Sequence, residues 1–259
     1  MSSQETIDVV QTVVRDDRGR YLLGKRAKDD YWEFLGGKVK KNENLREAAF
    51  RELEEETGIE PVKEEIEQYQ EGETYRSKDD RVYRLNPVLM EFTGVPEIKE
   101  LSEEHLETEW IDLMDFHQYE TLGQYQALEN LDIVNGKVGL AVPRKEDEYL
   151  VLKRSEETSS PGKWNFPGGK KEENEDLPET ALRELEEETG LKGEIRKEGK
   201  PYIGRGELGY WQITPFLVET SGEVTLNHEH SSYRWIDTPE PEELETLGTS
   251  QAVENLDVI

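Results

Sequence analysis

The chain has 259 residues, which is enough for two ordinary domains or one large one. Its 60 acidic and 32 basic residues give a net charge of −28, which argues against nucleic-acid binding and attachment to anionic lipid. Cysteine is absent, which excludes disulfides and thiol catalysis, and the four histidines show no metal-ligand spacing.

The distribution of charge and apolar residues narrows the class of protein further. No apolar run approaches the roughly 20 residues of a membrane span, and the opening MSSQETIDVV does not resemble a signal peptide, so a cytoplasmic protein is expected. The acidic residues are spread along the chain, which predicts a uniformly charged surface, with adaptation to high salt as one hypothesis. Apolar residues recur with the periods of strands and helices, which favours folded domains over disorder.

The second half of the chain repeats the first. YETLGQYQALENLDIV, which ends at Val134, matches LETLGTSQAVENLDVI, which ends at Ile259, and EWID matches RWID just upstream. The repeat predicts two domains of the same kind, residues 1–135 and 136–259. A turn at Asn135–Gly136 is expected to mark the boundary, because Asn-Gly pairs favour turns.

The first half alternates strand and helix signals. Strand-like runs at Ile7–Val14 and Tyr21–Lys25 come first. A Gly-Gly loop leads into a helix near Leu45–Thr57, which Gly58 is suited to end. A strand at Tyr83–Phe92, a strand ending in W-I-D and a final helix follow.

The second half gives the same succession. Its strands are expected at Val138–Val142, Tyr149–Lys153 and Tyr210–Glu219, and its helix at Leu177–Thr189, with Gly190 as the stop. Strands mixed with helices predict the α/β (α+β) class, with a mixed sheet and helices packed on it in each half.

The predicted helices carry clustered carboxylates. At 100° per residue, Glu52, Glu55 and Glu56 share an arc of about 100°, beside an apolar stripe of Ala49 and Leu53. Glutamates 184, 187 and 188 repeat the pattern. Such carboxylates repel each other unless a cation binds, and all-oxygen ligands suit Mg²⁺ or Mn²⁺. A solvated, Glu-rich surface is the alternative interpretation.

At these positions both halves resemble the Nudix family. The family's box is G-x5-E-x7-R-E-U-x-E-E-x-G-U, where U is a bulky aliphatic residue, and neither copy departs from it. The first copy consists of Gly37, Glu43, Arg51, Glu52, Leu53, Glu55, Glu56, Gly58 and Ile59. The second consists of Gly169, Glu175, Arg183, Glu184, Leu185, Glu187, Glu188, Gly190 and Leu191. The resemblance implies two Nudix domains in tandem, each an α/β/α sandwich.

The resemblance also implies a reaction and roles for the box residues. The reaction is hydrolysis of a nucleoside diphosphate linked to a group X, a small-molecule substrate, with Mg²⁺ or Mn²⁺ as cofactor. The implied metal ligands are Gly37, Glu52, Glu55 and Glu56, and Gly169, Glu184, Glu187 and Glu188. Of these, Glu52 and Glu184 are also the catalytic residues that orient and deprotonate water. Two pairs, Glu43 with Arg51 and Glu175 with Arg183, are expected to orient the loop and helix.

Weaker candidates lie outside the box. Arg26 and Arg154 end matching strands and are candidates for phosphate binding. Four aromatic residues are candidates for stacking on a base, with core packing as the alternative: Trp32, Phe34, Trp164 and Phe166. Three glutamates near the W-I-D segments are accessory candidates: Glu104, Glu109 and Glu229. The second half has Arg234 where the first has Glu109, which suggests that the halves differ in substrate or rate.

A pyrophosphohydrolase with two active sites is the favoured function. A non-catalytic nucleotide sensor and a protein with one active and one structural domain are the alternatives. The substrate stays open among nucleoside triphosphates, ADP-ribose, nucleotide sugars and dinucleoside polyphosphates, with W-E-F-L-G-G-K favouring triphosphates in the first half. No nucleic-acid or membrane partner is expected, and the two domains are expected to pack as an intramolecular pseudo-dimer.

Overall fold

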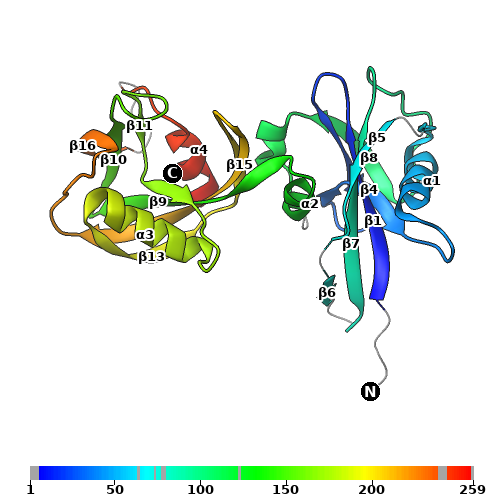
Figure 1. Cartoon of the computed structure of the whole chain (residues 1–259), viewed down its shortest axis with the longest axis horizontal. Coiled ribbons are helices and arrows are strands. Elements are labelled where there is room, and N and C mark those ends of the chain that lie inside the picture. The colour runs from blue at the N-terminus through cyan, green and yellow to red at the C-terminus, as the bar shows by residue number, and fades with distance from the viewer. Residues whose placement is uncertain are drawn as a thin grey trace. The chain divides into compact units, whose positions relative to one another are not determined.

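The chain folds into two compact units, Met1–Val134 and Asn135–Ile259, each with one copy of the repeat (Figure 1). The computed structural model describes residues 6–62, 65–72, 74–76, 80–121, 124–238 and 244–257, without the side chain of Ile66. The predicted turn at Asn135–Gly136 is wrong, because both residues belong to strand β9 (Val134–Lys145). Gly136 has a φ of 148°, which residues with a side chain rarely adopt, so glycine lets the strand continue through this position.

The first unit contains a mixed eight-stranded sheet. Its strands are β1 (Thr6–Arg15), β2 (Tyr21–Arg26), β3 (Trp32–Glu33), β4 (Leu35–Lys38), β5 (Ile66–Tyr69), β6 (Thr74–Arg76), β7 (Val82–Glu91) and β8 (His105–Ile111). The central order is β3-β2-β1-β7-β5, with β4 on β1, β6 on β7 and β8 on β2. Strands β1 and β7 are parallel from Thr6–Val82 to Arg15–Glu91, whereas β4 runs antiparallel to β1.

The second unit repeats this sheet. Its strands are β9, β10 (Glu148–Arg154), β11 (Trp164–Asn165), β12 (Gly168–Lys170), β13 (Lys192–Glu198), β14 (Tyr202–Gly206), β15 (Gly209–Ser221) and β16 (His230–Ile236). The order β11-β10-β9-β15-β13, with β12 on β9, β14 on β15 and β16 on β10, matches the first sheet strand for strand.

The long helices α1 (Leu45–Thr57) and α3 (Leu177–Thr189) have the bounds that the sequence predicts. Asn44 and Asp176 begin them with capping boxes, in which the cap side chain and a glutamate three residues later satisfy each other's backbone N–H groups. Gly58 and Gly190 end them in the left-handed conformation, as predicted. The shorter helices are η2 (Leu113–Gln118), α2 (Gln124–Asn130) and α4 (Thr249–Leu256).

Alternating strand residues build a hydrophobic layer on each face of the sheet. In the second unit Leu150 and Leu152 pack with Leu185 of α3, whereas Val151, between them, packs with Leu256 of α4. Side chains alternate in direction along a strand, so α3 and α4 cover opposite faces of the sheet (Figure 1). This confirms the three-layer α/β/α arrangement in that unit. In the first unit the α1 layer contains Val10, Leu22, Ala49, Leu53 and Val88.

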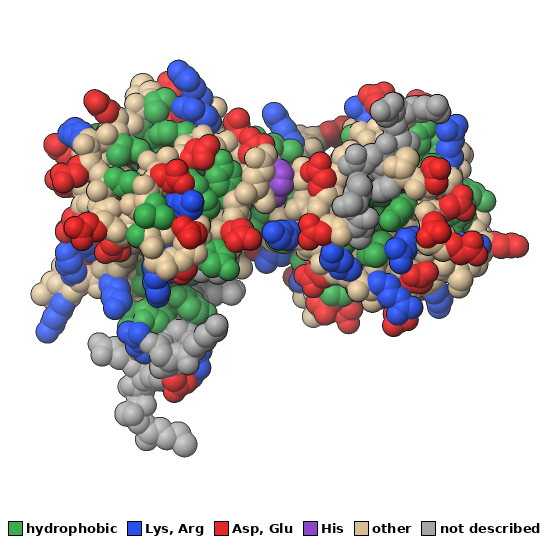
Figure 2. Space-filling model, turned by 180° about the vertical axis from the view of Figure 1, so that it is seen from behind, with side chains coloured by type: hydrophobic (Ala, Val, Ile, Leu, Met, Phe, Trp, Pro, Cys, Tyr) green, Lys and Arg blue, Asp and Glu red, His purple; other side chains and the backbone are tan. Residues whose placement is uncertain are grey.

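Charged side chains of both signs are interspersed over the visible face of each unit (Figure 2). Among the described residues, no helix is long and apolar enough to cross a membrane.

Candidate active site

Each site begins where a glycine-containing strand meets the long helix. Gly37 of β4 pairs with Val10 of β1, and Gly169 of β12 occupies the same place against β9. A Cβ atom at Gly37 would overlap the carboxylate of Glu52, and one at Gly169 would overlap the carboxylate of Glu184. A side chain at either glycine would therefore displace the neighbouring carboxylate from its present position.

Arg51 joins the acidic side chains of the first site. Its Nε and NH2 donate to the two carboxylate oxygens of Glu43 at 2.7 and 2.9 Å. Its NH1 donates to Glu52 at 2.6 Å and to Glu55 at 3.0 Å, and NH2 also donates to the carbonyl of Lys38 at 3.1 Å. Because Glu43 and Lys38 precede the helix, Arg51 ties the loop to it.

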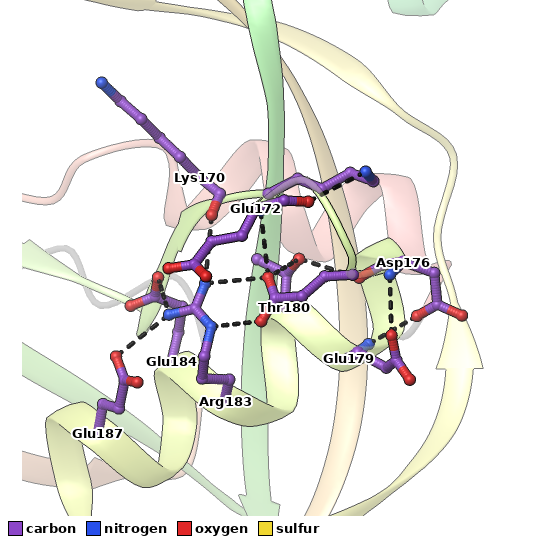
Figure 3. Close-up of polar contacts among 10 residues, drawn as sticks. Lys170, Glu172, Asp176, Glu179, Thr180, Arg183, Glu184 and Glu187 are labelled. Atoms are coloured by element: carbon purple, nitrogen blue, oxygen red, sulfur yellow. Dashed lines mark hydrogen bonds and ion pairs between the residues drawn. The ribbon is translucent and has the colours of Figure 1, made fainter.

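Arg183 makes the same contacts in the second site (Figure 3). Its Nε donates to Glu175 at 2.5 Å and its NH2 to the same carboxylate at 3.2 Å. Its NH1 donates to Glu184 at 2.7 Å and to Glu187 at 3.1 Å, and NH2 reaches the carbonyl of Lys170 at 3.2 Å. The hydrogen bonds from the arginine are the main cause that lowers the pKa of Glu43 and of Glu175 to about 2.

One carboxylate in each site is buried beneath the glycine turn. Glu56 accepts a hydrogen bond from the Gly36 N–H at 3.0 Å, and Glu188 accepts one from Gly168 at 3.3 Å. Burial raises the pKa of Glu56 to about 9 and of Glu188 to about 8, and nearby glutamates, Glu52 in the first site, add to the effect. Burial also raises the pKa of Glu52 and Glu184.

The donor chemistry of these clusters fits a divalent cation. Carboxylates whose pKa is raised by burial and mutual repulsion are stabilised by added positive charge. The Oε2 of Glu188 is buried and has no hydrogen-bond partner among the described residues, so its lone pairs are available. However, among the residues that the structure describes, no three His, Asp or Glu side chains are arranged to hold a metal ion. In the first site Glu52 and Glu55 both contact Arg51, so a cation has to compete with its guanidinium.

A cavity of about 570 Å³ adjoins the first site. It is lined by Val9, Val10, Gln11, Arg26, Glu33, Phe34, Gly36, Thr74, Tyr75, Leu85, Gln124, Gln126, Ala127 and Asn130. A second hollow of about 450 Å³ shares Arg26 and Glu33 with it. Because Gly36 lines the cavity and its N–H donates to Glu56 of α1, the cavity ends beside that helix.

The structure places the two candidate arginines differently. Arg26 lines both hollows and contacts Asp29 at 3.0 Å and Glu33 at 3.2 Å. Arg154 instead donates to Ser159, to its carbonyl at 2.5 Å and its hydroxyl at 3.1 Å.

For Trp164 and Phe166 the structure favours core packing, the alternative that the sequence left open, over stacking on a base. Trp164 and Phe166 are 7% and 1% exposed in the α4 layer of the core, so their rings offer no face to a base. Trp32 packs edge-on against Tyr119 at 5.1 Å and does not line the cavity. Phe34 does line it, although its ring is 2% exposed and stacks on a core aromatic residue.

Two of the three accessory glutamates lie near the buried carboxylates, and one does not. Glu104 lines the smaller hollow, and its charge raises the pKa of Glu56. Glu229 similarly raises the pKa of Glu188. Glu109 does not join the carboxylate cluster of α1. Its neighbour Trp110 packs on the α1 layer, so Glu109 faces the other side of the sheet. There it accepts a hydrogen bond from Tyr119.

Three buried or half-buried polar residues near the sites escaped the sequence reasoning. His230 is 6% exposed, and its Nε2 lies 3.6 Å from Glu188 Oε2; burial lowers the pKa of His230 to about 4. In the first unit His105, in the same place, faces Glu33 at 3.6 Å instead. The sequence offered a signal for these residues in its repeat. His105 and His230 directly follow the accessory glutamates Glu104 and Glu229, and Glu33 lies between the aromatic candidates Trp32 and Phe34.

Comparisons with known proteins establish the family. The model of the NUDIX domain matches residues 6–131 and 136–255, so the chain belongs to the Nudix hydrolase family, with two domains in tandem.

The individual relatives match one domain or less. The chain is 33% identical over 128 residues to the RNA pyrophosphohydrolase of Pelagibacter ubique (strain HTCC1062), covering 42% of this chain and 78% of that protein. It is 48% identical over 58 residues to the CTP pyrophosphohydrolase of Escherichia coli (strain K12), covering 21% of this chain and 42% of that protein. A solved MutT protein from Methanosarcina mazei Go1 is 26% identical, with a TM-score of 0.42, over 51% of this chain and 96% of that one.

Proposed function

We propose that each domain hydrolyses the pyrophosphate bond of a nucleoside diphosphate linked to a group X, with Mg²⁺ or Mn²⁺. The observation that carries this proposal is the recurrence of one arrangement, in which an arginine joins three glutamates beside a glycine turn, in both domains. Family membership and the names of the relatives agree with it.

The box residues then have distinct roles. Glu52, Glu55, Glu56 and the carbonyl of Gly37 would hold the cation in the first site, once Glu52 and Glu55 turn from Arg51 towards it. Their counterparts from Gly169 to Glu188 would hold it in the second. When bound, the cation neutralises pyrophosphate oxygens and lowers the pKa of water. Glu52 and Glu184 orient the attacking water and accept its proton.

The cavity of the first domain is proposed to take the nucleoside part of the substrate. Its volume of about 570 Å³ suits a small ligand, and Arg26 at its edge suits phosphate. The net charge of −28 favours small nucleotides over RNA, although one relative carries the name RNA pyrophosphohydrolase.

The test is incubation with Mg²⁺ and a panel of nucleoside triphosphates, ADP-ribose, nucleotide sugars, dinucleoside polyphosphates and a 5′-triphosphate RNA, with products identified by mass. Release of a nucleoside monophosphate or similar product supports the proposal. The single variants Glu52→Gln and Glu184→Gln are each expected to remove one site's turnover, and the double variant to remove all of it.

Other outcomes favour the alternatives. Ligand binding without turnover would indicate a nucleotide sensor, and loss of all turnover from one single variant would make the other domain structural. The intramolecular pseudo-dimer and the cytoplasmic location stay predictions; X-ray scattering that fits two loosely tethered bodies would contradict the first.

A further inference from the structure

The place that the cavity occupies in the first domain is built from different residues in the second. The strand pairs Val10–Gly37 and Gly139–Gly169 align β1 with β9, which places Gln11 opposite Leu140 in the repeat. The final segments of the two halves likewise align Gln124 with Thr249 and Ala127 with Ala252. The two domains can therefore be compared position by position.

In the second domain these positions belong to the hydrophobic core. Phe166 and Ala252, which correspond to the cavity residues Phe34 and Ala127, lie in one buried cluster with Tyr202. Leu140 packs against the same cluster. Tyr202 is 4% exposed, and its ring packs in this cluster with Phe166 and Ala252.

In the first domain the same place is hollow and partly polar. Gln11 and Gln124 line the cavity and are 7% and 2% exposed. The Oε1 of Gln124 has no hydrogen-bond partner among the described residues. A buried acceptor without a partner costs free energy, which a ligand N–H recovers on binding. Nucleobases carry such N–H groups along their polar edges.

We propose that the two sites perform the same hydrolysis but differ in recognition. The first domain encloses the nucleoside and discriminates between bases through Gln11 and Gln124. The second domain, whose equivalent space is filled, leaves the base outside its core and accepts different bases alike. This inference rests on the proposed pyrophosphohydrolase function, and extends it by assigning base selectivity to one site only.

The full chain tests the inference when one site is inactivated at a time. Glu184→Gln leaves the first site, and Glu52→Gln leaves the second; circular dichroism checks that both variants fold. With Mg²⁺ and ATP, GTP, CTP or UTP, kcat/KM at the first site is expected to vary by about tenfold or more, the effect of one mismatched buried hydrogen bond. At the second site it is expected to vary by less than about threefold, because apolar Leu140 replaces Gln11 and the short, fully buried hydroxyl of Thr249 replaces the amide of Gln124.

Exchanging residues between the domains locates the cause. In the Glu184→Gln background, Gln11→Leu and Gln124→Thr introduce the second domain's residues. Both are expected to reduce the variation of kcat/KM among the four nucleoside triphosphates. Gln251→Thr, on α4, is the matched control and is expected to leave the variation of kcat/KM among the four nucleoside triphosphates unchanged. Turnover with equal spread at both sites would overturn the inference while the proposed function stands. No turnover at either site would overturn both.

Discussion

Arg51 and Arg183 show how single residues manage the negative charge of each site. Each guanidinium contacts three glutamates, two on its own helix and one on the preceding loop. The planar fork of arginine allows a two-point contact with Glu43 or Glu175 and leaves NH1 for the others. A lysine in the same place offers one compact charge and cannot span these contacts.

Replacing Arg51 by lysine is therefore expected to destabilise the first domain by about 1–3 kcal/mol, the range for lost hydrogen bonds to charged groups. Urea unfolding followed by tryptophan fluorescence measures the change. Arg46→Lys, on the exposed side of the same helix, is the control and should change the free energy of unfolding by less than about 0.5 kcal/mol. Equal effects of the two substitutions would contradict the bridging role.

The loop glutamates, Glu43 and Glu175, predict how the free energy of unfolding depends on pH. The pKa of Glu43 and Glu175 is lowered from 4.5 to about 2, so these groups hold fewer protons in the folded chain than in the unfolded one. Their contribution to stability is present above pH 4.5 and is lost as the pH falls towards 2. Melting curves between pH 2 and 6 should therefore show a weaker pH dependence for Glu43→Gln than for the wild type.

At the scale of elements, the ends of α1 and α3 fix where the carboxylates lie. Gly58 and Gly190 have φ values of 68° and 69°, a conformation that residues with a side chain rarely adopt. Their surroundings differ: a Cβ at Gly58 would lie 2.9 Å from Lys99 Cβ, whereas the nearest atom to one at Gly190 is 3.5 Å away.

We expect Gly190→Ala to cost about 1 kcal/mol from backbone strain alone, and Gly58→Ala to cost more because of the close contact with Lys99. Urea unfolding of the two variants, compared with the wild type, provides the measurement. A smaller loss for Gly58→Ala than for Gly190→Ala would show that the backbone near Lys99 moves to relieve the contact.

At the scale of the whole molecule, the excess of acid governs how stability responds to salt. A net charge of −28 makes the folded chain repel itself, and dissolved ions screen that repulsion. We expect the melting temperature to rise between low and molar KCl, at constant pH and protein concentration. A melting temperature that does not rise would count against adaptation to high salt.

Much of the fold was accessible from the sequence, because local rules decide it. The period of apolar residues and the glycine stops gave the bounds of α1 and α3, and the repeat indicated that both halves share one architecture. The Asn135–Gly136 pair is a counter-example: the turn preference of the dipeptide yields to strand pairing, because β9 extends through it.

The family, the two carboxylate clusters and the arginines that join them could be read from the sequence, because all lie within a few helical turns of one another. What surrounds these clusters follows instead from how distant segments pack. Whether Phe34 lines a cavity and Phe166 fills a core depends on residues far apart in the chain, such as Gln11 and Gln124 in one domain and Leu140 and Tyr202 in the other. His230 and Glu188 are also far apart in the sequence, and they meet because β16 pairs with β10 and α3 packs on that sheet.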